Sequence, residues 1–334
     1  MTSTVDVDVL LVGAGPVGLY GAYYAGFRGL SVALIDSLEE AGGQITAMYP
    51  EKLIFDVAGF PAIKGRDLVA GLVEQAAAFS PEYLLGRQAT SLQRQEDGTI
   101  LVGSEDGTTV HCKAVIISGG IGTFTPRPLP AGSEYEKRGL HYFVPKLSDH
   151  TDRDIVIVGG GDSAFDWALN LQPIARSVTL VHRRETFRAH AHTVSQVRAT
   201  DVEIVTEAQV AAVRGADGVA EVDILVGPAK SQDKVLRTLP AQTLIAALGF
   251  VANIGPITKW GLSVAHNRHV TVDTTMQTDV EGVFAAGDIA DYPGKVRLIS
   301  VGFGEVATAV NNAAVLIDPA AHLFPGHSSE APPV

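Results

Sequence analysis

The chain has 334 residues, which suits two domains, and its 46% hydrophobic against 19% charged residues can form a large buried core. The net charge of −12 argues against general nucleic-acid binding. The single cysteine, Cys112, excludes an intrachain disulfide and favours a cytoplasmic location. No signal peptide is expected, and no apolar run approaches the roughly 18 residues of a membrane span, so we expect no membrane association.

The N-terminal segment predicts a strand, a glycine-rich turn, a helix and a second strand. Val7 to Val12 is an apolar run typical of a buried parallel strand, and Ser31 to Ile35 fits its neighbour. Between them, Gly13-Ala14-Gly15-Pro16-Val17-Gly18 forms a Gly-x-Gly-x-x-Gly turn that opens a helix over Pro16 to Arg28. Such a turn lets backbone approach a pyrophosphate because no Cβ intervenes. Asp36 is expected to accept hydrogen bonds from ribose hydroxyls.

The next segments extend this first domain. Gly65 to Phe79 has helical periodicity, and Glu96 to Val110 contains two Asp-Gly pairs that predict a β-meander. Ala114 to Ser118 then returns to the sheet. Residues 122–132 hold three prolines, which break both helix and sheet, so we place a domain crossing there.

A second unit of the same kind begins at Asp154 to Val158 and ends with the strand Val178 to Val181. Its turn is Gly159-Gly160-Gly161-Asp162-Ser163-Ala164, in which alanine takes the third glycine position, an accepted variant. Where an NAD site has an acid, this chain has His182-Arg183-Arg184, with Arg188 four positions on. Arginine binds phosphate oxygens bidentately, so the sequence predicts a 2′-phosphate and a preference for NADPH over NADH.

The rest of the chain completes both domains. Strands are expected around Val202 to Val205, Val219 to Val226 and Leu244 to Ala247, and residues 248–253 predict the second crossing. We therefore expect an α/β fold with two Rossmann-like, three-layer ββα nucleotide-binding domains, the second inserted into the first. The predicted bounds are 1–121 with 252–334 for the first domain, and 122–251 for the second.

A further motif points to the ligand of the first domain. Gly282 to Asp288 is an apolar strand that ends in Gly-Asp, which would place Asp288 at the carboxyl end of the sheet, where ligands bind. A helix over Ser300 to Leu316 would begin at the same crevice, and its N-terminus would stabilise a reduced, anionic flavin ring. Taken alone, Asp288 fits a turn or capping aspartate equally well.

In this order, the motifs resemble the low-molecular-weight thioredoxin reductase fold over nearly the whole chain. The segments that carry the resemblance are Gly13 to Gly18, Gly42-Gly43-Gln44, Gly159 to Ala164, His182 to Ala189 and Gly282 to Asp288. The redox Cys-x-x-Cys of thioredoxin reductases is missing, since residues 138–145 contain no cysteine, and Cys112 is expected as a small buried apolar residue. The chain is most similar to the cysteine-free branch, the thioredoxin-reductase-like ferredoxin–NADP⁺ reductases.

The resemblance implies FAD in the first domain, NADPH in the second, and ferredoxin, or flavodoxin, as the electron acceptor. It implies that Tyr49 stacks on one face of the flavin ring. It also implies that the C-terminal extension, residues 318–334, crosses to the second subunit of a homodimer, where His327 covers the other face. The remaining FAD contacts that it implies are Gly43, Gln44, Ala89, Phe124 and Ser329.

Hydride transfer requires no general acid or base, so we expect no catalytic triad, and no histidine pattern suggests a metal site. The histidines at positions 141, 150, 190 and 192 are expected at the surface, the last two in a strand or loop. Ferredoxins are usually acidic, so docking to this acidic chain needs a local basic patch. The candidates are Lys52, Lys64, Arg66, Lys137, Arg138, Lys146, Lys295 and Arg297.

Two alternative functions stay open at this point. An NADPH-dependent diaphorase or oxidase on the same scaffold would reduce flavodoxin, quinone or oxygen. A redox-state binding module would hold FAD without turnover, and NADPH would then fail to bleach the yellow protein.

Overall fold

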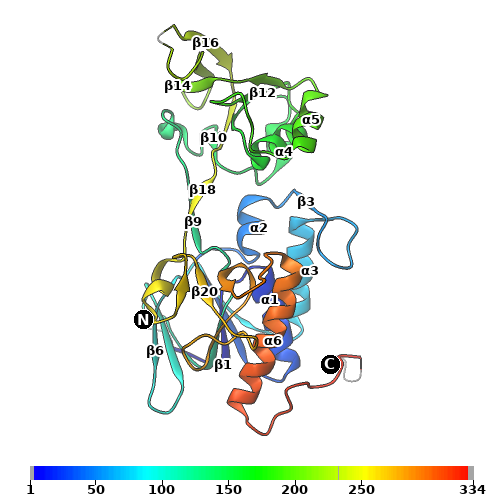
Figure 1. The fold of residues 1–334 in the computed structure, drawn as a ribbon, viewed down its shortest axis with the longest axis vertical. Helices are drawn as coiled ribbons and strands as arrows, with labels where there is room; N and C mark the ends of the chain where they lie inside the picture. The colour runs from blue at the N-terminus through cyan, green and yellow to red at the C-terminus, as the bar shows by residue number, and fades with distance from the viewer. Residues whose placement is uncertain (1–3, 232, 330–334) are drawn as a thin grey trace. The chain divides into compact units, whose positions relative to one another are not determined.

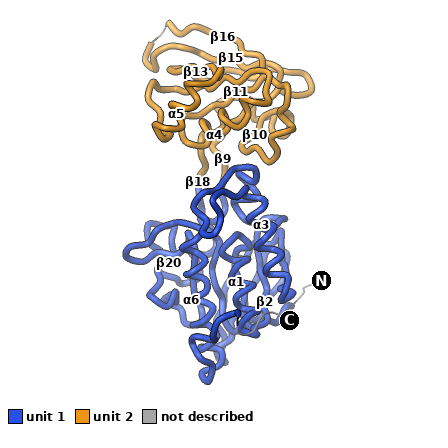
Figure 2. Tube along the Cα trace, turned by 90° about the vertical axis from the view of Figure 1, so that its right-hand side faces the viewer, with its two compact units in different colours: residues 1–124, 252–334 blue, residues 125–251 orange. Residues whose placement is uncertain are grey.

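The computed structural model describes residues 4–231 and 233–329. The chain divides into two compact units (Figures 1 and 2). Unit 1 comprises Met1–Phe124 and Ala252–Val334, and unit 2 comprises Thr125–Val251. Each unit contains one of the two glycine-rich turns. Unit 2 is inserted into unit 1, as the fold-class prediction required.

Unit 1 is built on a seven-stranded sheet in the order β5-β2-β1-β8-β7-β6, with β21 also pairing β8. The strands are β1 (Thr4–Val12), β2 (Val32–Asp36), β5 (Glu82–Leu85), β6 (Ala89–Arg94), β7 (Ile100–Ser104), β8 (Thr109–Ile117) and β21 (Val283–Ala285). β1 pairs in parallel with both β2 and β8, which explains its apolar run, because Val9, Leu10 and Leu11 are completely buried. The predicted meander forms the antiparallel part, β6-β7-β8.

Helices cover this sheet: α1 (Pro16–Phe27), α2 (Gly43–Met48), α3 (Gly65–Ala77) and α6 (Ile299–Ile317). α1 contacts both α3 and α6. The approach to α6 is close, since a Cβ at Gly21 would lie 2.6 Å from Val306 Cγ2. The short elements of unit 1 are β3 (Leu53–Ile54), β4 (Ile63–Lys64), β19 (Val264–Ala265), β20 (His269–Thr271), β22 (Ala290–Asp291), η3 (Gly255–Lys259) and η4 (Gly287–Ile289).

One helix of the described residues, α6, is long and apolar enough to cross a membrane by length and composition, contrary to the sequence expectation. Packing accounts for its apolar side chains. Val306, Ala309 and Val310 are completely buried, and α6 contacts α1 and β8. The core helix of a domain meets the same two criteria as a membrane span.

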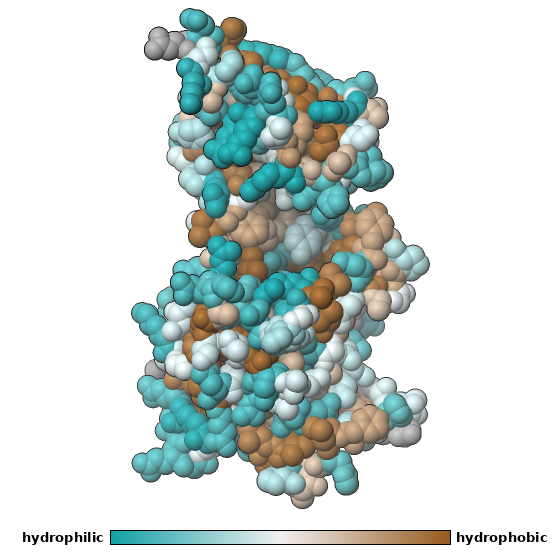
Figure 3. Space-filling view, viewed as in Figure 1, coloured by the Kyte–Doolittle hydropathy of each residue, from teal (hydrophilic) through white to brown (hydrophobic). Residues whose placement is uncertain are grey.

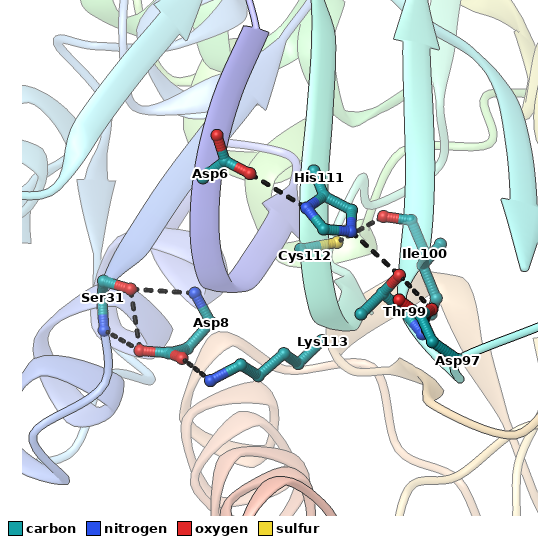
Figure 4. A network of polar contacts seen from close by, with 9 residues as sticks. All are labelled: Asp6, Asp8, Ser31, Asp97, Thr99, Ile100, His111, Cys112 and Lys113. Atoms are coloured by element: carbon teal, nitrogen blue, oxygen red, sulfur yellow. Dashed lines mark hydrogen bonds and ion pairs between the residues drawn. The ribbon is translucent and has the colours of Figure 1, made fainter. Parts of the chain in front are cut away.

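Polar contacts fasten the start of β1 to β8 and to the turn before β7 (Figure 4). His111 lies with Nδ1 2.9 Å from Asp6 Oδ1 and with Nε2 2.9 Å from Thr99 Oγ1. Two residues further along the same two strands, Lys113 Nζ donates to Asp8 Oδ1 over 2.8 Å. Such largely exposed pairs contribute under about 1 kcal/mol each, so they adjust the register of the strands more than they stabilise the unit.

Unit 2 has three layers. Its parallel sheet runs β10-β17-β11-β12-β13, and a three-stranded antiparallel sheet runs β14-β15-β16. The strands are β10 (Leu140–His141), β11 (Asp154–Gly159), β12 (Ser177–Val181), β13 (Glu203–Val205), β14 (Ala208–Arg214), β15 (Glu221–Val226), β16 (Val235–Pro240) and β17 (Thr243–Ala247). Its helices are α4 (Asp162–Leu171), α5 (Ala191–Arg198), η1 (Ser133–Tyr135) and η2 (Leu147–His150). Along β11, Val156 and Val158 pack toward the small sheet, whereas Ile155 and Ile157 pack toward the helices.

The two connections between the units pair with each other as β9 (Thr123–Pro126) and β18 (Phe250–Asn253). The prediction that prolines prevent a strand over residues 122–132 was therefore wrong at its start. Pro126 ends β9, a position at which the missing N–H does not disrupt pairing. A Cβ at Gly122 would lie 2.2 Å from Asn253 O, and Thr123 Oγ1 donates to the same oxygen over 3.1 Å.

Two predictions about histidines were also wrong. His192 lies in α5 rather than in a strand or loop, whereas His190 lies in the loop that directly precedes that helix, as predicted. His150 is 2% exposed, with Nδ1 3.2 Å from Thr243 Oγ1 and its ring edge-on to His141. An isolated histidine carries too little periodic signal for a sequence to show which side of a short helix it occupies.

Candidate nucleotide-binding sites

A cavity of about 460 Å³ opens at the carboxyl ends of β1, β2 and β8 in unit 1. Its lining brings together most of the residues predicted to contact FAD: Gly13, Gly15, Asp36, Gly43, Gln44, Tyr49, Ala89, Phe124 and Asp288. They come from strand ends, turns and short helices that are far apart in the sequence. The volume lies within the range of ordinary ligand sites.

The glycine turn leaves no space for a side chain at Gly13. Gly13 has φ +118°, and a Cβ there would lie 2.6 Å from Ser118 O. Across the turn, a Cβ at Gly43 would lie 2.9 Å from Gly15 Cα. α1 begins directly after this turn, and no side chain caps its first N–H groups. Its first turn therefore offers backbone donors and the positive end of a helix dipole to an anionic group.

The carboxylate of Asp36 is held by the backbone at the end of β2. Oδ2 accepts from Ala14 N over 2.7 Å, and Oδ1 accepts from Leu38 N over 2.9 Å. Burial raises the pKa of Asp36, and the two backbone donors act in the opposite direction. Each carboxylate oxygen can accept a second hydrogen bond, so the group fits a pair of ribose hydroxyls.

Tyr49 and Asp288 lie close to each other in the cavity. Burial raises the pKa of Tyr49, and the charge of Asp288 adds to the effect. Asp288 belongs to η4, and its carbonyl oxygen lies 3.0 Å from His269 Nδ1. Leu298 and Ile299, at the start of α6, line the same cavity. An aromatic ring, a carboxylate and a helix N-terminus therefore converge, a combination suited to a flat heterocycle with a polar edge.

Three predicted residues lie outside the cavity lining. Gly18 lies behind the turn, where a Cβ would approach Gly13 O to 1.9 Å, so its role is in packing. His327 and Ser329 are exposed in the C-terminal extension. The extension is attached to α1, because Arg28 donates through Nη2 to His322 O over 2.9 Å.

The glycine turn of unit 2 lies between β11 and α4. A Cβ at Gly160 would lie 2.2 Å from the His182 ring, whereas Gly161 faces open space. α4 also begins without a side-chain cap, and Ser163 is exposed in its first turn. Asp162 Oδ1 accepts from His190 N over 2.8 Å, so this acid is engaged on the α5 side of the turn.

The basic residues predicted to bind a 2′-phosphate lie next to this turn. Arg188 donates through its backbone N–H to Gly160 O over 2.8 Å. The side chains of Arg183, Arg184 and Arg188 are exposed and form no ion pair with a described residue. His182 differs, because burial lowers its pKa and its Nε2 lies 3.2 Å from Thr186 O. The three guanidinium groups are therefore the cations of this surface.

Sequence reasoning missed several residues of the cavity in unit 1. They are Arg87, Gln88, Thr123, Pro256, Ile257 and Leu298. Pro256 and Ile257 belong to η3, where the chain re-enters unit 1, and no local pattern marks that segment. Arg87 had a partial signal, since it follows β5 directly at the edge where the other ligand-facing turns lie.

The basic residues proposed for docking are not equivalent. Lys295 is wrong as a candidate, because its side chain is 2% exposed and paired with Glu305. Lys64 and Arg66 share Glu51. The remaining pairs are Arg66 with Asp67, Lys146 with Asp149 and Arg297 with Asp291. Most of the positive charge of this set is therefore already balanced locally.

Exposed apolar side chains gather over the loop between β3 and β4 and the start of α6 (Figure 3). They are Leu53, Phe55, Phe60, Val296 and Leu298. Ser300 Oγ holds the loop against α6, because it donates to Asp56 O and accepts from Ala58 N. Leu298 also lines the cavity, so this surface is continuous with it.

Comparisons with known proteins agree with the geometry. Residues 7–313 match the pyridine nucleotide-disulphide oxidoreductase family. A ferredoxin–NADP reductase of Nocardioides sp. is 61% identical over 98% of both chains, and one of Frankia alni is 62% identical over 96% of this chain and 98% of its own. The chain belongs to the ferredoxin–NADP reductase family. Among solved structures, the thioredoxin reductase of T. acidophilum has a TM-score of 0.75 at 24% identity, covering 95% of this chain and 99% of that one, and thus shares the fold.

Membership of the ferredoxin–NADP reductase family accords with the state of the one thiol. Cys112 is 1% exposed in β8, with Sγ 3.6 Å from Ile100 O, as predicted for a small apolar residue. Burial raises the pKa of this thiol to about 12. A neutral, enclosed thiol is no nucleophile at physiological pH, so this member of the ferredoxin–NADP reductase family has no thiol relay of its own.

Proposed function

We propose that unit 1 binds FAD, that unit 2 binds NADPH, and that the chain carries electrons from NADPH through FAD to a ferredoxin. The observation that carries this proposal is the contrast between the ends of the two second strands: one ends in a partly buried, oriented carboxylate, and the other is followed by three exposed arginines. A bound flavin would supply the redox chemistry, as a hydride acceptor toward the nicotinamide and a one-electron donor toward an iron–sulfur partner.

In unit 1, the chain binds and orients the cofactor. The turn at Gly13 and Gly15 and the first turn of α1 would bind the pyrophosphate, and Asp36 would bind the ribose. Tyr49 would pack on the ring and exclude water from one face. Asp288 and the start of α6 would contact the polar part of the cofactor at that end of the cavity. Gln44, Ala89 and Phe124 supply further lining.

In unit 2, Gly159 to Gly161 and the first turn of α4, with Ser163 and Ala164, would bind the pyrophosphate of NADPH. Arg183, Arg184 and Arg188 would bind its 2′-phosphate. His182, whose pKa is lowered by burial, would contribute a neutral ring packed against the turn. The chain's arginines therefore supply the discrimination against NADH.

Features of the surface support proposals for the partner and for the assembly. The exposed apolar residues from Leu53 to Leu298 lie next to the cavity and offer a docking face for ferredoxin, or for flavodoxin. The exposed extension, which does not line its own chain's cavity, supports a homodimer in which His327 and Ser329 complete the second subunit's site. One buried, reduced thiol accords with a cytoplasmic location.

Anaerobic spectroscopy tests the proposal. The purified protein should carry a yellow flavin that NADPH bleaches and ferredoxin reoxidises. A colourless protein, or a yellow one that NADPH fails to bleach, would refute electron transfer and leave a binding module. Bleaching with reoxidation by oxygen, quinone or flavodoxin but not by a panel of ferredoxins would establish the diaphorase or oxidase alternative instead.

A further inference from the structure

A buried ion pair lies next to the cavity of unit 1 without forming part of its lining. Glu305, on α6, is 5% exposed, and Lys295, in the loop before α6, is 2% exposed, measured on their side chains. Lys295 Nζ lies 2.5 Å from Glu305 Oε1, and Tyr292 OH donates to the same oxygen over 2.6 Å. The carboxylate thus joins the loop over residues 292–295 to α6.

The second oxygen of Glu305 acts on the backbone that carries Asp288. Gly287 N–H donates to Glu305 Oε2 over 2.8 Å. Gly287 has φ +79°, and a Cβ there would lie 3.1 Å from Val17 Cγ2. A Cβ at Gly302 of α6 would lie 3.3 Å from Gly287 Cα. The turn is therefore enclosed between the starts of α1 and α6, with one charged acceptor for its N–H.

A buried ion pair gives little net stability, because desolvation of both ions offsets their attraction. Loss of one partner is costly, since it leaves a buried charge uncompensated. Loss of Glu305 would also leave the Gly287 N–H without its acceptor. Loss of Lys295 would leave that hydrogen bond in place. The two residues can therefore be separated by experiment.

We propose that Glu305 is a positioning residue: through the Gly287 N–H it fixes the Gly287–Asp288 turn in the conformation that binds the cofactor of unit 1. Lys295 supplies the opposite charge that accompanies Glu305 in its buried position. This inference rests on the proposed binding of FAD by unit 1.

Reconstitution of the full-length apoprotein with FAD tests it. The readouts are the FAD dissociation constant, from flavin fluorescence, and the visible circular dichroism of the bound flavin. Glu305→Ala should raise the dissociation constant by about tenfold or more, because the turn loses its charged acceptor. Lys295→Met, which retains the Gly287 hydrogen bond, should raise it less than about threefold while lowering thermal stability.

Asp223→Asn is the matched control, because Asp223 is a buried carboxylate paired with Arg214 in unit 2. It should lower stability and leave FAD affinity within about twofold. Should Glu305→Ala fail to fold, Glu305→Gln decides, with an expected rise of about threefold or more.

Two results would overturn the inference. One is FAD affinity within twofold of the wild type in the folded Glu305 variant. The other is an equal loss in Lys295→Met, which would make the pair a stabiliser of unit 1 in general. If the wild-type apoprotein itself binds no FAD, the proposed function fails, and that outcome is separate from both.

Discussion

The two units begin with the same strand, glycine turn, helix and strand, yet the ends of their second strands are organised in opposite ways. In unit 1, Asp36 is partly buried and held by the N–H groups of Ala14 and Leu38. In unit 2, Arg183 and Arg184 are exposed. Ribose hydroxyls are neutral and need an acceptor whose position is fixed beforehand. A phosphate is doubly charged and attracts hydrated, mobile cations over several ångströms.

The largest effect is expected at the third glycine position, where the two turns differ. A Cβ at Gly18 would lie 1.9 Å from Gly13 O, whereas unit 2 has Ala164 at the equivalent place. We expect Gly18→Ala to lower the free energy of unfolding of unit 1 by about 3 kcal/mol or more and to abolish FAD retention. Urea titration and flavin absorbance measure the two effects.

The matched control is Ala164→Gly, which should cost about 1 kcal/mol in unit 2 and leave FAD content unchanged. A Gly18→Ala protein that purifies yellow with the stability of the wild type would show that the two turns tolerate a methyl group equally.

The arginines give the next largest effect. Replacing Arg183 and Arg184 together by alanine should raise KM for NADPH about 100-fold and KM for NADH less than about threefold, because only NADPH has the 2′-phosphate. Steady-state kinetics with both donors measures this.

Arg237→Ala serves as the control, since Arg237 is exposed on the small sheet of unit 2 but paired with Glu203 of β13. An equal rise of KM for both donors in the double variant would contradict the assignment of the 2′-phosphate.

Acid sensitivity should be greatest in unit 2. Burial lowers the pKa of His150 to about 4, and the nearby charges of His141 and Arg153 add to this. Between about pH 6.5 and 4, the unfolded chain therefore binds a proton that the folded chain does not. The free energy of unfolding of unit 2 should thus fall by on the order of 2–3 kcal/mol as the pH drops through this range.

Trp167, in α4, reports on unit 2 when Trp260 is replaced by phenylalanine. Urea titrations at several pH values, followed by the fluorescence of Trp167, measure how the free energy of unfolding of unit 2 changes with pH. The His150→Gln variant should lose most of this pH dependence. An unchanged pH dependence in that variant would assign the acid sensitivity to other groups.

The smallest effect is expected at the thiol. Cys112→Ala should cost about 1 kcal/mol of stability and leave NADPH-dependent ferredoxin reduction unchanged. A thiol reagent should leave the native protein unmodified and react once the protein is denatured, because the buried thiol has a pKa of about 12. Loss of ferredoxin reduction in this variant would show that the Cys112 thiol takes part in the reaction.

Much of this molecule could be predicted from local patterns. β1, α1, β2 and their equivalents in unit 2 follow from apolar runs, glycines and a charged residue at a fixed spacing. β14 and β16 were missed, because an antiparallel strand depends on a partner that the local sequence does not name. α2 was missed as well, since six residues carry too little periodicity. His150 and Lys295 look like surface residues, and only their distant neighbours bury them.

The sequence by itself determined the two βαβ units, the opposite charge at the ends of their second strands and the lack of a second cysteine, because these depend on residues adjacent along the chain. The tertiary structure alone decided which residues meet at the cavity of unit 1, since Tyr49, Phe124, Pro256 and Asp288 come from separate segments of the chain. It also decided that Glu305 reaches the Gly287 N–H. A buried carboxylate acquires its role from the donors that surround it, and those donors are assembled only by folding.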